Sequence, residues 1–146
     1  MLPISSIGDI AHVIQLAVAP VFLLTGVGTL LAVLTNRLAR TVDRSRVLEK
    51  LLPGTVGETL AQAHAELVLL ARRTRLIYIA IALAVMSALF VCLLIAVAFV
   101  DAFVAANLAK AIGALFVLAM LALIGCLLVF LREIFLAVSS ARRAMH

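Results

Sequence analysis

Three long runs of uncharged, mostly apolar residues stand out along the chain, at about positions 10–36, 76–100 and 111–131. An α-helix rises about 1.5 Å per residue, so each run is long enough to cross the roughly 30 Å of hydrocarbon in a lipid bilayer. The first run is too long for the apolar core of a signal peptide, and Asp9 precedes it where a signal peptide would carry basic residues. The pattern therefore predicts three retained transmembrane helices.

The stretch between the first two runs, about 37–75, also has a helical pattern. Its apolar residues recur at helical spacing on both sides of the breaker sequence LLPG at 51–54, which predicts a helical hairpin. Thr55 and Glu58 have the spacing of a capping box, in which each side chain satisfies a free amide at the start of a helix. We therefore expect the second arm of the hairpin to begin near Thr55.

Neither Gly nor Pro occurs in the segment 58–100, so the second arm and the second span are expected to form one helix of more than about 40 residues, roughly 65 Å long. The third span is expected to continue past Arg132 toward Arg143, because no breaker interrupts its apolar face. The sequence thus predicts an all-α fold with a single membrane domain, 1–146. This domain is a three-helix bundle whose long helices extend into the cytoplasm as the hairpin and a tail, 132–146.

The composition requires lipid as part of the protein's solvent. Hydrophobic residues make up 66% of the 146 residues, charged residues make up only 13%, and the mean hydropathy is +1.31. So few polar side chains cannot cover a water-exposed surface. The lipid bilayer is therefore the first partner that the sequence implies.

The basic residues lie almost entirely on one side of the predicted spans. Of the twelve Lys and Arg residues, eight fall between the first two spans and three follow the third, whereas the opposite side holds only Lys110, together with Asp9 and Asp101. Positively charged loops near helix ends stay in the cytoplasm. We therefore expect a multi-pass plasma-membrane protein with its N-terminus outside and with its hairpin and C-terminus in the cytoplasm.

The high isoelectric point of about 10.3 follows mainly from this topology, so nucleic acid is not an expected partner. Anionic lipid headgroups are the usual partners of basic residues at a membrane surface. Arg37, Arg40 and Arg44 share one helix face and can meet headgroups, anions or acidic residues of the other arm. The acidic residues of the hairpin, Glu66 among them, make weak ion pairs between the arms a further expectation.

The sequence contains no residues with the spacing of a catalytic or metal-binding motif. It has no nucleophile elbow, no H-E-x-x-H helix and no phosphate-binding glycine loop. His12, His64 and His146 lie in three separate regions, which disfavours a metal site. Cys92 and Cys126 lie at different predicted depths, so we expect two small packing residues and no disulfide. We expect no enzymatic activity and no cofactor.

Polar and small residues follow a seven-residue rhythm along the first predicted helix. Such spacing drifts only slowly around a helix, so these residues form one continuous face. His and Gln side chains at membrane depth are costly in hydrocarbon and usually face protein or water. The residues of this face, predicted to line a path between several copies of the chain, are Asp9, His12, Gln15, Phe22, Gly26, Thr29, Asn36 and Arg40.

Two functions fit such a face. One chain has too little interior to enclose a path, so we expect a homo-oligomer in which the first helix lines a channel for ions. An outer polar vestibule would then lead to a narrow apolar ring at Phe22 and to an inner exit. The alternative is a non-conducting scaffold or accessory subunit, which binds a partner through its cytoplasmic hairpin. A small transporter is disfavoured, because the sequence shows no inverted repeat or broken helix pair.

Small residues repeat every four positions along the second predicted helix. A row of this kind lets a neighbouring backbone approach closely and gain dispersion contacts. The row predicts a helix-packing face formed by Ala80, Ala84, Ala88, Cys92 and Ala96.

The segment 7–28, IGDIAHVIQLAVAPVFLLTGVG, is followed by NRLAR at 36–40 and by Asp43 and Arg44. With these motifs the chain resembles, over nearly its whole length, a family of small bacterial membrane proteins described as a domain of unknown function. The resemblance implies three membrane helices and a location in the bacterial inner membrane. It carries no catalytic residues over to this sequence.

Overall fold

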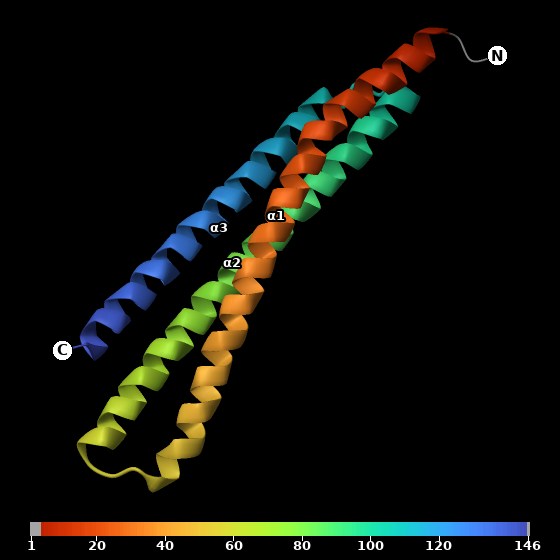
Figure 1. Ribbon diagram of the computed structural model, residues 1–146. Helices are drawn as coiled ribbons and strands as arrows, with labels where there is room; N and C mark the ends of the chain where they lie inside the picture. The colour runs from red at the N-terminus through yellow and green to blue at the C-terminus, as the bar shows by residue number, and fades with distance from the viewer. Residues whose placement is uncertain (1–3, 146) are drawn as a thin grey trace. The chain divides into compact units, whose positions relative to one another are not determined.

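The computed structural model describes residues 4–145. Over this range the chain forms three long helices, α1 (Ile4–Leu51), α2 (Glu58–Val104) and α3 (Ala109–Ala144), with a short 3-10 turn, η1 (Leu52–Gly54), after α1 (Figure 1). No strand occurs among these residues. Each of the three helices is long and apolar enough to cross a membrane. The expected all-α fold with three helices of membrane-spanning length and composition is therefore confirmed.

Helices α2 and α3 are as continuous as the sequence predicts, and α1 is continuous as well. Helix α2 contains 47 residues without interruption, and α3 runs past Arg132 as far as Ala144. Helix α1 is continuous over 48 residues and passes through Pro20. Proline removes one amide donor from a helix, but a complete break would leave more backbone groups unsatisfied, which hydrocarbon does not tolerate.

The connection between α1 and α2 differs in one respect from the expected hairpin. The hydroxyl of Thr55 donates hydrogen bonds to the carbonyl oxygens of Leu51 (2.7 Å) and Leu52 (3.2 Å). It therefore satisfies the last carbonyls of α1 and does not cap the start of α2. The capping box expected for Thr55 and Glu58 is wrong, because a Thr hydroxyl can bond to nearby carbonyls behind it as well as to amides ahead of it.

Helix α2 begins at Glu58, three residues after the expected start. Gly57 precedes it with φ at 75°, a left-handed conformation that costs other residues roughly 1–2 kcal/mol. The carbonyl oxygen of Gly57 accepts the amides of Leu60 (3.1 Å) and Ala61 (3.3 Å), the first hydrogen bonds of the helix. A glycine, and not a capping side chain, therefore controls the entry into α2.

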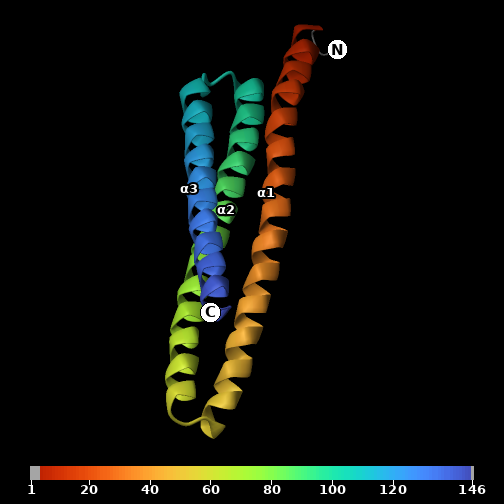
Figure 2. The same cartoon turned by 60° about the vertical axis from the view of Figure 1, so that its left-hand side comes forward.

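A tight turn, residues 105–108, joins α2 to α3. The two helices lie side by side next to this turn (Figures 1 and 2). Ala105 and Asn107 have positive φ angles of 50° and 56°. The side chain of Asp101 accepts the amide of Leu108 (2.9 Å), and its backbone oxygen accepts the amide of Ala105 (2.8 Å). Asp101 thus satisfies amides at both ends of the turn.

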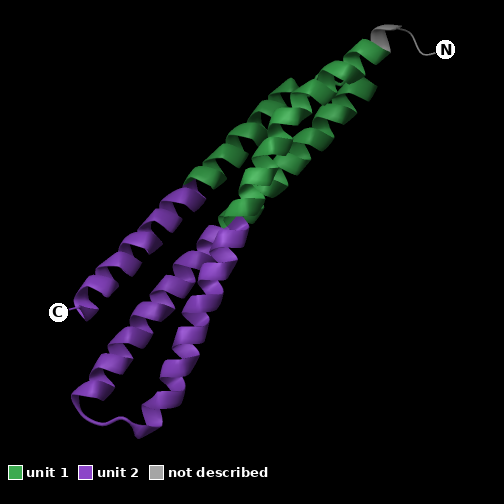
Figure 3. Ribbon diagram, in the orientation of Figure 1, with its two compact units in different colours: residues 1–30, 83–124 green, residues 31–82, 125–146 purple. Residues whose placement is uncertain are grey.

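The chain forms two compact units (Figure 3). The first unit contains residues 4–30 and 83–124 of the described chain, which are parts of all three helices. The hydroxyl of Ser87 on α2 donates to the carbonyl oxygen of Ala119 on α3 (2.9 Å), and both residues are buried. Small side chains at this contact allow the two helices to approach closely. The buried residues of the unit are Val27, Ala84, Ser87, Val91, Leu94 and Ala119.

The second unit contains residues 31–82 and 125–145, again with parts of all three helices. Apart from Ala80, which is also buried, its buried side chains recur every seven residues along each helix, the spacing of coiled-coil packing. The buried rows are Leu34, Thr41 and Leu48 on α1, Leu70 and Ile77 on α2, and Cys126 and Glu133 on α3. A carboxylate therefore occupies a core position.

Most of the apolar surface of the helices is not buried within the chain. Within the most apolar 18-residue segment of each helix, the buried share is only 6% in α1, 22% in α2 and 11% in α3. Phe22, Phe103 and Phe135 are each about two-thirds exposed or more. An apolar surface of this extent requires lipid or another protein chain to cover it.

Candidate functional site

The residues of the polar face predicted on α1 are not part of the packed core. In the first unit Val27 lies on the packed side of α1, with 2% of its surface exposed. In the second unit Leu34 marks the same side and is fully buried. All eight predicted path residues are exposed: Asp9, His12, Gln15, Phe22, Gly26 and Thr29 in the first unit, and Asn36 and Arg40 in the second.

The chain satisfies only some of the polar groups on this face. The hydroxyl of Thr29 donates to the carbonyl oxygen of Thr25 (3.1 Å). The hydroxyl of Thr25 donates in turn to the carbonyl oxygen of Val21 (3.3 Å). Both threonines are therefore satisfied within α1 and tolerate an apolar neighbour. Within the described residues, the side chains of His12 and Gln15 make no hydrogen bond or ion pair. The described part of the chain therefore offers no partner to these two groups.

The four-residue row predicted on α2 coincides with the packed side of that helix only in its first half. Ala80 and Ala84 are fully buried and Ala88 is half-buried, whereas Cys92 and Ala96 are exposed. Steps of four residues turn by about 40° around a helix, so such a row leaves the packed side after a few members. Packing therefore continues along α2 at Ser87, Val91 and Leu94.

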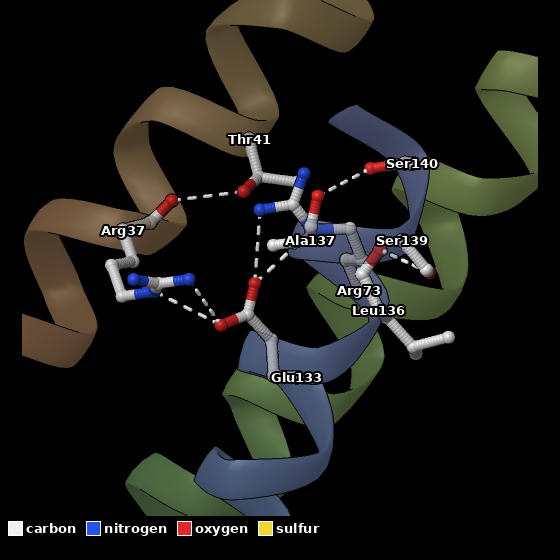
Figure 4. Close-up of polar contacts among 8 residues, drawn as sticks. All are labelled: Arg37, Thr41, Arg73, Glu133, Leu136, Ala137, Ser139 and Ser140. Carbon is white, nitrogen blue, oxygen red and sulfur yellow. Dashed lines mark hydrogen bonds and ion pairs between the residues drawn. The ribbon is translucent and has the colours of Figure 1, made fainter. Parts of the chain in front are cut away.

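A buried carboxylate connects three helices in the second unit (Figure 4). Glu133 on α3 is 1% exposed, and each of its oxygens accepts from a different arginine. Oε2 lies 2.9 Å from Nε and 2.7 Å from Nη2 of Arg37 on α1, and Oε1 lies 3.1 Å from Nε and 3.0 Å from Nη2 of Arg73 on α2. The guanidinium of Arg37 also lies 5.5 Å from the centre of the Phe130 ring. One side chain thus ties α3 to both α1 and α2.

This number of partners is what makes a buried carboxylate tolerable. An ion moved into a protein interior costs several kcal/mol, even after the surroundings relax. Glu133 offsets that cost with forked, charge-assisted hydrogen bonds from two guanidinium groups. The side chains of Arg37 and Arg73 keep 31% and 20% exposure, and the three charges sum to +1. Such a cluster specifies how the helices align more than it adds net stability.

The prediction of site residues from the sequence missed Glu133. Arg37 was expected to meet headgroups, anions or the other arm of the hairpin, and its partner instead lies on α3, 96 residues away. A signal for this contact does exist in the sequence. Arg37 directly follows the first predicted span, Arg73 lies just before the second and Glu133 just after the third, so all three have similar depth. Opposite charges at one depth on neighbouring helices tend to pair.

The expected ion pair between the hairpin arms is present. Nε of Arg44 lies 2.9 Å from Oε1 of Glu66, and the two side chains are 54% and 40% exposed. An exposed pair of this kind contributes about 0–1 kcal/mol. The pair therefore contributes less to holding the helices in place than the buried cluster does.

Two cavities open on the second unit. The first, about 770 Å³, lies between α1 and α2 and has mainly apolar walls that include Val42, Leu67 and Tyr78. The second, about 820 Å³, lies mainly between α2 and α3, and arginines line it. No group of three or more His, Cys, Asp or Glu side chains in the described part of the chain could hold a metal ion.

Together these features define a class of protein: a small all-α, multi-pass membrane protein with an unpartnered polar helix face and a buried charge cluster. The chain belongs to the DUF2721 family, which is described as a protein of unknown function and whose family model matches residues 17–143. The resemblance to a family of unknown function is therefore confirmed. The match begins after Asp9, His12 and Gln15. No curated protein and no solved structure matches the chain.

Proposed function

We propose that this protein is a homo-oligomeric ion channel of the bacterial inner membrane, in which copies of α1 surround the conducting path. The observation that supports this proposal is the outward position of the whole predicted face, since all eight of its residues are exposed on the chain. In a single chain these groups would face lipid. Several copies with this face turned toward a common axis would provide water and protein instead.

Helix lengths support a path of bilayer thickness. Lys110 and Arg132 on α3 are separated by about 22 residues, or about 33 Å, close to the hydrocarbon thickness of roughly 30 Å. The same number of residues before Arg37 on α1 reaches Gln15. Gln15 then lies at one boundary of the hydrocarbon, and His12 lies one turn beyond it. The polar groups without partners are thus near the mouth of the path.

The middle of the path carries an apolar constriction. Phe22 is 72% exposed and lies two turns inside Gln15 on the same face. Thr29, which follows it, has its hydroxyl bonded within the helix. Water leaves narrow apolar constrictions readily, so a ring of Phe22 side chains is the proposed gate. Asn36 and Arg40 then form the polar exit.

The proposed orientation places the N-terminus outside and the hairpin and C-terminus in the cytoplasm. Eleven of the twelve basic residues lie on one side of the three spans. Positive residues near the ends of membrane helices are retained on the cytoplasmic side. The arginines of the charge cluster then lie near the inner boundary of the bilayer.

Electrical recording from purified protein in planar bilayers tests the channel. The wild-type protein should carry current, His12→Ala should change its dependence on pH, and Phe22→Ala should raise the open probability because it removes the apolar ring. Val21→Ala is the matched control, since Val21 is 50% exposed on the adjacent position, about 100° away around the helix. Absence of current at every pH and voltage would rule out conduction.

A second candidate is a non-conducting scaffold, and one observation favours it. The hydroxyls of Thr25 and Thr29 bond within α1, and a methyl group added at Gly26 would meet nothing within 4 Å. A helix surface that is small and self-satisfied packs well against another helix without any water between them. In this case the polar face of α1 holds helices together and conducts nothing.

Crosslinking distinguishes the two candidates. A Thr29→Cys variant in a Cys92→Ser background places a thiol on the exposed face of α1. In the channel it should crosslink to a second copy of the chain, whereas in a scaffold for another protein it should crosslink only to that protein. Val21→Cys provides the control for random collision, because it lies away from the face.

A further inference from the structure

The cavity of about 820 Å³ in the second unit has a strongly basic lining. Its walls come from residues 65–73 of α2 and residues 137–144 of α3, with Arg44 added from α1. Four arginines and one glutamate line it, for a net charge of +3. The remaining lining is apolar or neutral, with Leu69 and Ala137 as examples. A basic recess with apolar walls beside a membrane span is typical of sites for amphiphilic anions.

The arginines of this cavity differ in what occupies them. Arg44 is paired with Glu66, so these two charges cancel. The side chains of Arg72 and Arg143, in contrast, make no hydrogen bond or ion pair with any residue that the structure describes. Two positive charges therefore face one recess from two different helices without a negative partner.

Arg73 is the fixed element of the cavity. A guanidinium has five N–H donors, and Glu133 receives the donor of Nε and one donor of Nη2. Three donors of Arg73 remain, and the buried carboxylate restrains the group that carries them. An arginine already held in place loses less conformational freedom when an anion binds.

The end of α3 opposes anion binding, but only weakly. The carbonyl groups of the last helical turn carry about half a negative charge in total. The arginines that line the cavity exceed this several-fold, since their net charge with Glu66 is +3. The cavity is therefore positive overall, and the end of α3 does not cancel its attraction for an anion.

We propose that this cavity binds a phosphate-bearing anion, with Arg72, Arg73 and Arg143 as the groups that hold the phosphate. Arginine donors match phosphate oxygens in geometry as well as in charge. The phosphate can belong to the headgroup of an anionic lipid or to a soluble anion. Arg72 lies four residues before the second predicted span, a distance of about 6 Å along the helix. The end of the cavity at Arg72 is therefore within reach of the headgroup layer. The proposal does not depend on ion conduction.

Thermal unfolding in a neutral detergent tests the proposal, because a ligand that binds the folded state raises the unfolding temperature. Dioleoylphosphatidylglycerol is added in one arm, dioleoylphosphatidylcholine, with the same acyl chains, in the second, and inorganic phosphate against chloride of equal ionic strength in the third. A saturable rise with phosphatidylglycerol alone assigns the site to a lipid. A rise with inorganic phosphate that also displaces the lipid assigns it to a soluble anion.

The variants Arg72→Gln and Arg143→Gln show whether the effect arises in this cavity. Each should weaken binding by about tenfold, since a hydrogen bond to a charged group is lost, and Arg143→Lys should lose less. Arg142→Gln is the matched control, because it removes the same charge one residue away, outside the lining. No saturable effect in any arm, or an equal loss in Arg142→Gln and Arg143→Gln, would overturn the proposal. Circular dichroism of each variant verifies that it folds.

Discussion

Among the described residues, Glu133 is the one acidic side chain that is buried. Its neighbours in the sequence are apolar apart from Arg132, whose side chain makes no ion pair with it among the described residues. Arg37 and Arg73 supply the compensating charge from two other helices. A single substitution in the cluster leaves a buried or partly buried charge without its counter-charge, which is costly. A substitution in the exposed pair of Arg44 and Glu66 leaves a charge in solvent and costs little.

Glu133→Gln should lower the free energy of unfolding by about 3–5 kcal/mol, because two partly buried guanidinium groups lose their counter-charge. Glu66→Gln, which breaks the exposed pair, should cost less than about 1 kcal/mol. The measurement is the rate at which a maleimide labels the buried Cys126 in a Cys92→Ser background as the temperature rises. Equal unfolding temperatures for the two variants would contradict a stabilising role for the cluster.

At the scale of the element, α2 owes its length to the absence of Gly and Pro, but its start depends on a particular backbone conformation. Gly57 has φ at 75° immediately before α2, whereas no left-handed φ occurs at Gly54 in the preceding turn. Substitution of each glycine therefore distinguishes the effect of the left-handed conformation from the general effect of replacing a glycine. Neither would meet another atom within 4 Å if it carried a methyl group.

Gly57→Ala should destabilise the protein by roughly 1–2 kcal/mol, because an L-residue resists the left-handed conformation. Gly54→Ala should be neutral, or stabilising by less than about 1 kcal/mol, since it reduces the freedom of the unfolded chain. Thermal unfolding of both variants in the same detergent measures the difference. An equal effect of the two substitutions would show that the start of α2 does not require this glycine.

At the scale of the whole molecule, the exposed face of α1 is where the proposed oligomer would form. Gly26 and Gly28 are both exposed, and neither would meet another atom within 4 Å if it carried a side-chain carbon. They are two residues apart in the sequence, so their positions around the helix differ by about 160°. Only Gly26 belongs to the proposed contact face. Substitution of either leaves the packing within one chain intact.

In the proposed oligomer, Gly26→Leu should therefore weaken the association between copies of the chain, whereas Gly28→Leu should not. A large side chain at a close helix contact keeps the two backbones apart and removes dispersion contacts. Sedimentation in detergent at several protein concentrations measures the oligomer, and circular dichroism verifies that both variants remain helical. Equal oligomer sizes for the two variants would place the interface elsewhere on the chain.

What the sequence determined by itself is local. Hydropathy marked the three spans, the absence of Gly and Pro from 58–100 predicted the long α2, and the lack of a breaker after Arg132 predicted the extension of α3. The seven-residue rhythm selected residues of α1 that are all exposed on the chain. Each of these properties depends on residues within a few turns of one helix. Local competition also explains the wrong capping box, because Thr55 had carbonyls of α1 within reach as well as amides of α2.

What only the tertiary structure decided is which helix faces meet. The contacts of Glu133 reach 96 residues back to Arg37 and 60 residues back to Arg73, and the sequence contains their similar depth but not their direction around each helix. The same direction determines that Ala80 packs while Cys92 is exposed, although both belong to one row. A rotation of one helix by a fraction of a turn would alter all these contacts without changing any local pattern, and tertiary packing alone selects that rotation.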